Sequence, residues 1–173
     1  MRQMANEATV AEPGRGPSGS AITGGRTSWL LCRVGTRLCA IPLARVIEVM
    51  RQLPIEVVPG APAFVRGLSV IRGAAVPVVD AGMLLGEAAT EGGRLLTVRT
   101  GSRTAGLAVD LVLGVHAFAD DMRSAMPPLM RDAAAETIAA IGILDAELLF
   151  FLRTTLSVPD ELFDRAAMVG AHP

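Results

Sequence analysis

Histidine, aspartate and serine residues in this sequence could support acid–base or nucleophilic chemistry. His116 lies in an apolar stretch and could act as a general base with Asp110 or Asp120. A nucleophile relay would also need a serine exposed at a strand-to-helix turn, whereas Ser69 lies inside a predicted strand. A structural histidine is the simpler interpretation of His116. The pattern therefore favours a protein without a catalytic centre, with a small β-barrel hydrolase as the enzyme alternative.

Asp80 and Asp110 each follow an apolar run and could form a carboxylate pair. Aspartate is also typical of strand ends and turns, and we assign both residues, together with Gly106, to such structural positions. A weak internal echo accompanies them, because residues 77–80 resemble residues 107–110. The echo is compatible with two similar sheets.

Cys32 and Cys39 are the only cysteines, and they could form a disulfide, bind a metal or remain reduced in the core. A zinc site needs four ligands, and only His116 and His172 could join them, the latter next to the C-terminus. Free cysteine is among the most buried residue types. We therefore predict two reduced core residues and no metal.

The composition excludes several classes of protein. The chain has 173 residues, a formal net charge of −1 and 19% charged residues, so it lacks the basic excess of a nucleic-acid-binding protein. All 16 basic residues are arginine, which excludes lysine Schiff bases and phosphate-loop lysines. Aromatic residues amount to 3%, too few for base-stacking platforms. We expect no cofactor and no nucleic acid partner.

The ends of the chain differ in composition from the middle. Residues 1–27 hold five glycines and two prolines without periodicity, which predicts a flexible N-terminal tail. The tail lacks the apolar stretch of a secretory signal, and no later charge-free apolar run reaches membrane-spanning length. We expect a cytoplasmic protein with no direct membrane insertion, one folded unit over 28–168 and a frayed C-terminus over 169–173.

From Trp29 onward, short apolar runs alternate with turn residues, which is typical of an all-β barrel or sandwich. Residues 44–51 are predicted as a strand, with a helix as the open alternative. Gly114 is predicted to mark a bulge or a close approach. The other predicted elements are strand pairs over 29–43, 67–79, 95–109 and 137–152, a strand over 111–118, a crossing loop over 120–132, a helical turn over 81–86 and a helix over 159–168.

Two features indicate a sheet that a partner protein could bind. The strand predicted near residue 48 would place Val46, Glu48 and Met50 on one face, either as an edge surface with one charge or as an apolar contact ringed by a charge. Two Arg-Gly steps, 66–67 and 72–73, lie among apolar β-branched residues. Glycine permits close approach and arginine offers a planar donor fork, although two solvated arginines would leave the same pattern.

Six ordered segments resemble the CheW family of chemotaxis coupling proteins, and the resemblance covers residues 29–165. The series Pro-Ala-Phe, Arg-Gly, Arg-Gly and Pro-Val-Val-Asp is its most specific part. The segments are 38–43, 46–49, 62–67, 71–73, 76–80 and 106–110.

The resemblance implies two interlocked five-stranded barrels of the Src-homology-3 type, with a hydrophobic seam and short helices, including one near the C-terminus. It also implies a non-catalytic adaptor that couples methyl-accepting chemoreceptors to a CheA-type histidine kinase, in chemotaxis or a related chemosensory signal transduction pathway. A groove between the barrels would take the helical tip of a receptor, and one barrel would dock on the kinase regulatory domain. The implied partner-binding residues are Val46, Glu48, Met50, Arg66, Gly67, Arg72 and Gly73.

Three positions depart from the family pattern. Val70 stands where asparagine is common, Ala81 where leucine is common, and Cys39 where an aromatic residue is frequent. These departures favour a divergent paralogue that serves a dedicated pathway, such as motility, development or second-messenger signalling. The alternative outside this class is a ligand-sensing β-barrel module whose apolar seam holds a small molecule.

Overall fold

The computed structural model describes residues 25–123, 136–156 and 158–170. The predicted all-β class, the strand pairs and the C-terminal helix are confirmed. The strands are β1 (Arg26–Val34), β2 (Arg37–Pro42), β3 (Val46–Arg51), β4 (Val65–Ile71), β5 (Ala74–Asp80), β6 (Arg94–Thr100), β7 (Arg103–Val109), β8 (Leu111–Ala119), β9 (Ile138–Leu144) and β10 (Glu147–Leu152). The helices are η1 (Leu43–Arg45), α1 (Ala81–Leu84), η2 (Asp120–Met122) and α3 (Asp160–Gly170).

Several predicted boundaries change. β1 begins at Arg26, inside the predicted tail, because Arg26 and Thr27 pair with β8. α3 continues to Gly170, beyond the predicted start of the frayed end. The segment 44–51, left open between strand and helix, begins within η1 and continues as β3. The rest of the predicted tail (1–24), residues 171–173 and most of the predicted crossing loop lie outside the described residues.

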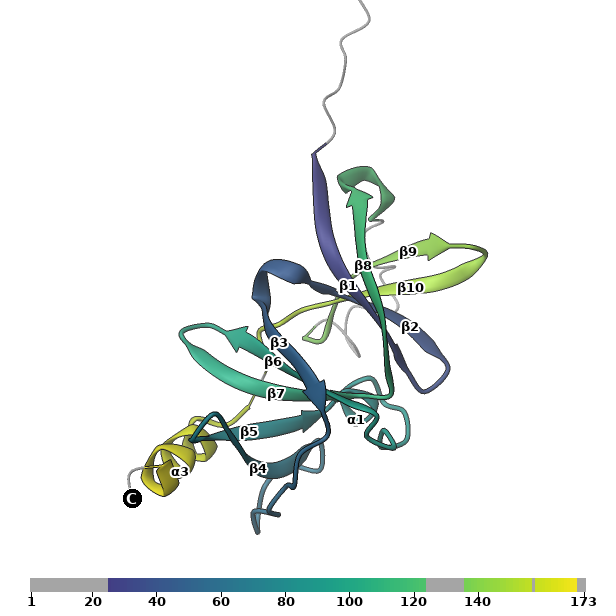
Figure 1. The fold of residues 1–173 in the computed structure, drawn as a ribbon. Coiled ribbons are helices and arrows are strands. Elements are labelled where there is room, and N and C mark those ends of the chain that lie inside the picture. The colour runs from purple at the N-terminus through teal and green to yellow at the C-terminus, as the bar shows by residue number, and fades with distance from the viewer. Residues whose placement is uncertain (1–24, 124–135, 157, 171–173) are drawn as a thin grey trace, which may run out of the picture.

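The ten strands form two five-stranded sheets, which we call barrel 1 and barrel 2 (Figure 1). Barrel 1 has the strand order β8-β1-β2-β10-β9, and barrel 2 has the order β3-β6-β7-β5-β4. α3 packs against β5 of barrel 2. No helix among these described residues is long and apolar enough to cross a bilayer.

The chain passes between the two barrels twice, so that barrel 1 combines strands from before and after barrel 2. The chain leaves barrel 1 after β2, passes through η1 and enters barrel 2 as β3. It leaves barrel 2 after β7, passes through Asp110 and re-enters barrel 1 as β8. The two barrels are therefore interlocked, as predicted.

The two barrels also share one pairing scheme. β1 and β2 correspond to β6 and β7, β8 corresponds to β3, and the hairpin β9–β10 corresponds to β4–β5. The register shifts correspond as well: the shift in β3 lies between Val46 and Glu48, and the shift in β8 lies between Val112 and Gly114. Gly114 is thus the predicted bulge position, and it occupies in barrel 1 the place of Glu48 in barrel 2.

The hairpin turns correspond in the same way. Arg72 and Gly73 connect β4 to β5 with φ angles of 49° and 82°. Asp145 and Ala146 connect β9 to β10 with φ angles of 48° and 67°. Two successive positive φ angles define the tight turn that matches the twist of a β-hairpin. Asp145 is therefore the counterpart of Arg72.

Three buried clusters stabilise this arrangement. The largest lies between the barrels and combines side chains such as Ile41 of β2 with Leu96 of β6. A second cluster, with Trp29 and Phe151, belongs to barrel 1. A third, with Leu95, belongs to barrel 2. The seam between the barrels is thus a mostly aliphatic core, and Val46 at the start of β3 packs against it.

Candidate interaction surface

The edge strand β3 of barrel 2 carries exposed apolar side chains. Ile47 and Val49 are 49% and 42% exposed, whereas Val46 and Met50 are half-buried and pack against the seam and the barrel 2 core. Exposed apolar residues on an edge strand are typical of a protein-binding site. The outward face of β3 therefore contains Ile47 and Val49, which the sequence analysis did not single out, and Val46 and Met50 support it from beneath.

Arg72 and Glu48 form a bidentate ion pair beside this face. The Arg72 Nε lies 3.0 Å from both carboxylate oxygens of Glu48, and Nη2 lies 2.6 Å from Oε2. The side chain of Arg72 is 80% exposed, whereas that of Glu48 is 21% exposed. Hydrogen bonding from Arg72 lowers the pKa of Glu48, and the same contact raises the pKa of Arg72. The pair therefore fixes Glu48 while it leaves the outer side of the guanidinium open to a partner.

The other Arg-Gly step lies in a different environment. The Arg66 guanidinium contacts the buried carboxylate of Asp80 at 2.6 Å, and it also hydrogen-bonds the carbonyl and hydroxyl oxygens of Thr90. The Asp80 carboxylate in turn accepts hydrogen bonds from the amides of Met83, at the start of α1, and Thr90. This internal network fixes α1 and the following loop to barrel 2. Arg66 is therefore occupied within the protein, in contrast to Arg72.

Gly67 and Gly106 lie at close approaches between backbones and side chains. A Cβ on Gly67, whose φ is 142°, would lie 2.0 Å from the carbonyl oxygen of Glu56. A Cβ on Gly106 would lie 3.1 Å from a methyl group of Val78. Gly73 differs, because it is exposed and a Cβ there would meet no described atom within 4 Å. Of the two predicted Arg-Gly steps, only 72–73 is open to a partner.

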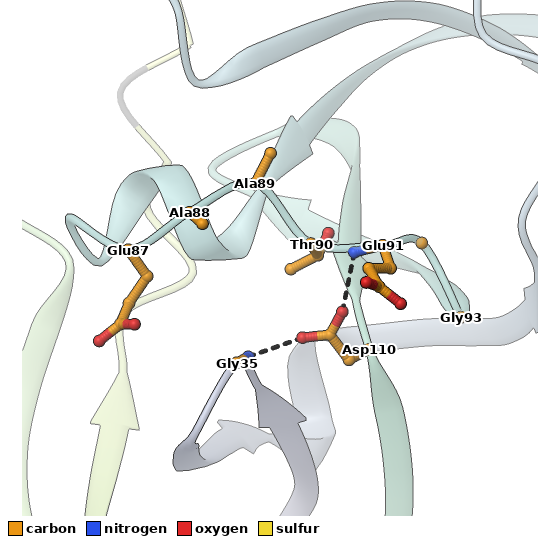
Figure 2. Close-up of a pocket in the computed structure, with 9 residues that line it drawn as sticks. Gly35, Glu87, Ala88, Ala89, Thr90, Glu91, Gly93 and Asp110 are labelled. Atoms are coloured by element: carbon orange, nitrogen blue, oxygen red, sulfur yellow. Dashed lines mark hydrogen bonds between the residues drawn. The ribbon is translucent and has the colours of Figure 1, made fainter.

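Asp110 connects the two barrels at the mouth of the seam. Its carboxylate accepts hydrogen bonds from the Gly35 amide at 2.6 Å and the Glu91 amide at 3.0 Å (Figure 2). These residues line a cavity of about 500 Å³ together with Glu87, which pairs with Arg37 at 2.6 Å. Two of the three carboxylates of the cavity are therefore used to hold the loop against the β1–β2 turn.

The residues of the enzyme alternative do not form a relay. His116 is exposed on β8 and stacks on Phe118, with ring centroids 6.1 Å apart. Asp110 is held by backbone amides, and Asp120 accepts hydrogen bonds from Thr27 and Arg123. Among the described residues, neither aspartate is hydrogen-bonded to His116. The arrangement does not favour a hydrolase.

The two cysteines pair directly across β1 and β2, and both are fully buried. The interpretation as core residues is therefore confirmed. Burial raises the pKa of Cys39 to about 12 and raises that of Cys32 well above its ordinary value. Both side chains remain protonated thiols in the folded protein at neutral pH.

Comparisons with known proteins agree with this geometry. The model of the CheW-like domain family matches residues 28–158. The chain belongs to this family. Within it, the chain is 35% identical over 119 residues to Protein FrzA of Myxococcus xanthus, an alignment covering 66% of this chain and 71% of that protein. It is 30% identical over 129 residues to the Chemotaxis protein CheW of Rhizobium meliloti (strain 1021), covering 73% and 82% of the two chains.

A solved CheW structure has the same fold. The scaffolding protein TtCheW from Thermoanaerobacter tengcongensis superposes with a TM-score of 0.68 at 21% sequence identity. The superposition covers 75% of this chain and 90% of that one. The two interlocked barrels are therefore the CheW-like fold, and the surface formed by Ile47, Val49, Glu48 and Arg72 is carried on that fold.

Proposed function

We propose that this protein is a non-catalytic cytoplasmic adaptor that couples methyl-accepting chemoreceptors to a CheA-type histidine kinase. Membership of the CheW-like family supports this proposal, together with the similarity to a relative named as the Chemotaxis protein CheW. The observation that carries it is the combination on one edge of barrel 2 of exposed apolar Ile47 and Val49 with the open guanidinium of Arg72. This combination supports a role in binding partner proteins.

The proposed surface consists of Ile47, Val49, Glu48, Arg72 and Gly73, with Val46 and Met50 beneath it. An amphipathic receptor helix would lay its apolar side chains against Ile47 and Val49. Arg72 would set its orientation through a charge-assisted contact at the rim. Barrel 1, at the opposite side of the seam, remains available for the regulatory domain of the kinase. The adaptor would transmit signals by holding both partners in fixed relative positions.

The ligand-sensing alternative is less well supported by the seam. A sensor of this kind would need an enclosed apolar cavity between the barrels. The seam instead holds closely buried side chains, including Ile41, Leu96 and Val98. Cavities lined by described residues include two apolar grooves and the cavity near Asp110.

Reconstitution of the signalling complex tests the proposed function. The purified adaptor is mixed with receptor-containing membranes and the CheA-type kinase of the same organism, and kinase autophosphorylation is measured with and without the adaptor. We expect receptor control of the kinase only when the adaptor is present. The Ile47→Asp/Val49→Asp variant should abolish this control. Met168→Asp/Val169→Asp makes the same double change at exposed apolar positions of α3 and serves as the matched control. Equal coupling by both variants would refute the assignment of the surface.

A further inference from the structure

Barrel 1 contains a groove at the position where barrel 2 has its ion pair. The groove has a volume of about 210 Å³ and lies between the edge strand β8 and the hairpin β9–β10. Its apolar walls are Leu31, Leu38, Leu113 and Leu144; His116 also lines it, and Asp145 lies at its rim. The pairing schemes make Gly114 the counterpart of Glu48 and Asp145 the counterpart of Arg72. Barrel 1 therefore has a glycine and an acid where barrel 2 has an acid and a base.

Barrel 1 has no side chain at the position that Glu48 occupies in barrel 2. In barrel 2 the half-buried Glu48 extends from β3 toward the turn and meets Arg72. In barrel 1, a Cβ built on Gly114 would meet no described atom within 4 Å. The neighbouring strand also differs, because Leu31 pairs with Gly114 whereas Thr97 pairs with Glu48. No internal ion pair therefore replaces the one between Glu48 and Arg72, and Leu31 contributes to the apolar groove beside this position.

The charged residues around the groove indicate which kind of side chain could bind in it. Arg33 and Glu147 line it as a pair at 2.6 Å and neutralise each other. Asp145 has no ion pair among the described residues and is exposed. An occupant would therefore need an apolar stem for the leucine walls and a positive head for Asp145. An arginine side chain satisfies both requirements, because its methylene groups pack on apolar surface while its guanidinium binds a carboxylate.

We propose that this groove is a second docking site, which takes an arginine presented by a peptide segment of a partner protein. The arginine would form between two molecules the kind of ion pair that Glu48 and Arg72 form within barrel 2. The site is separate from the proposed receptor-binding edge of β3, since the two lie on different barrels. It therefore does not depend on the receptor-binding role of that edge, and Arg72 takes no part in it.

Selection from a display library of random peptides, with the full chain as bait, tests this proposal. We expect enriched peptides to contain arginine next to an apolar residue, and fluorescence anisotropy then gives their affinities. Asp145→Arg should weaken their binding roughly tenfold or more, because it replaces attraction by repulsion. The new arginine fits the turn, since Arg72 has nearly the same φ in barrel 2, 49° against 48° for Asp145.

Two control variants make the result decisive. Asp164→Arg makes the same change of charge at an exposed position of α3, the helix that packs on barrel 2, and should leave peptide affinity unchanged. Arg72→Glu should also leave it unchanged, which separates this site from the proposed coupling surface. Enrichment of peptides without a basic residue, equal binding by Asp145→Arg, or no enrichment at all would overturn the proposal.

Discussion

The guanidinium of Arg72 binds both carboxylate oxygens of Glu48 across the open side of barrel 2, from the β4–β5 turn to the edge strand β3. β3 and β4 are the two edge strands of this sheet, and no ladder of backbone hydrogen bonds connects them. The pair therefore links the two edges of barrel 2 and presents a cation at the same point.

Arg72→Glu should abolish binding to the receptor, while it leaves the fold and the proposed binding of the kinase to barrel 1 intact. The substitution places two carboxylates side by side and removes the exposed cation, but Arg72 is too exposed to contribute much to stability. Pull-down of both partners measures binding, and thermal unfolding measures the fold. The double variant Glu48→Arg/Arg72→Glu restores the link with reversed charges. If the partner contacts Arg72 directly, the double variant remains unable to bind. Recovery of binding would instead mean that the ion pair has a purely structural role.

Arg66→Ala should destabilise the protein by about 3–5 kcal/mol, because it leaves the buried Asp80 carboxylate without its cation. The matched control is Arg33→Ala, which breaks a surface pair with Glu147 and should cost about 0–1 kcal/mol. Chemical denaturation gives both free energies of unfolding. A loss of the same size in the two variants would show that the Arg66 network contributes no more than a surface contact.

Gly67→Ala should be much more destabilising than Gly73→Ala, although both glycines have positive φ. Alanine at position 73 carries mainly a backbone cost of about 1–2 kcal/mol. At position 67 the added methyl group also meets the Glu56 carbonyl, which should add about 1–3 kcal/mol. Denaturation curves of the two variants measure the difference. Equal losses of stability in the two variants would mean that the backbone around Glu56 can move away from the added methyl group without a cost in free energy.

The free energy of unfolding should fall as the pH rises above the ordinary pKa of a cysteine thiol. An unfolded thiol ionises near pH 8.5 or so, whereas folded Cys39 retains its proton up to about pH 12, so the unfolded state is progressively favoured between these values. The chain has no lysine and no tyrosine, so few other groups titrate in this window. Free energies of unfolding measured along this range test the effect. The slope should flatten in a Cys32→Ala/Cys39→Ala variant, and an unchanged slope would contradict the thiol origin.

Local patterns in the sequence were sufficient to predict the strands, because turn residues such as Gly35 and Gly101 separate short apolar runs. They were insufficient for the outward face of β3. Both faces of that strand are apolar, and only the seam, formed by distant strands, decides that Val46 packs inward while Ile47 remains exposed. Alternation alone carries no information about which face a distant sheet will cover.

The two Arg-Gly steps looked alike for the same reason. Asp80 reaches Arg66 only because β4 and β5 pair, and Arg72 meets Glu48 only because both sheet edges converge. The internal echo was also ambiguous: its two copies lie on β5 and β7, which are neighbouring parallel strands of one barrel. The true correspondence relates β5 to β10 and β7 to β2, and it left no recognisable trace in the residue types.

The two crossings of the chain between the barrels have a mechanical consequence. Each barrel is connected to the other by two covalent links, one through η1 and one through Asp110 alone. Such short links leave little freedom for one barrel to hinge or twist against the other. The two barrels should therefore move together as one rigid body, so that a displacement of one barrel moves the other barrel in the same direction.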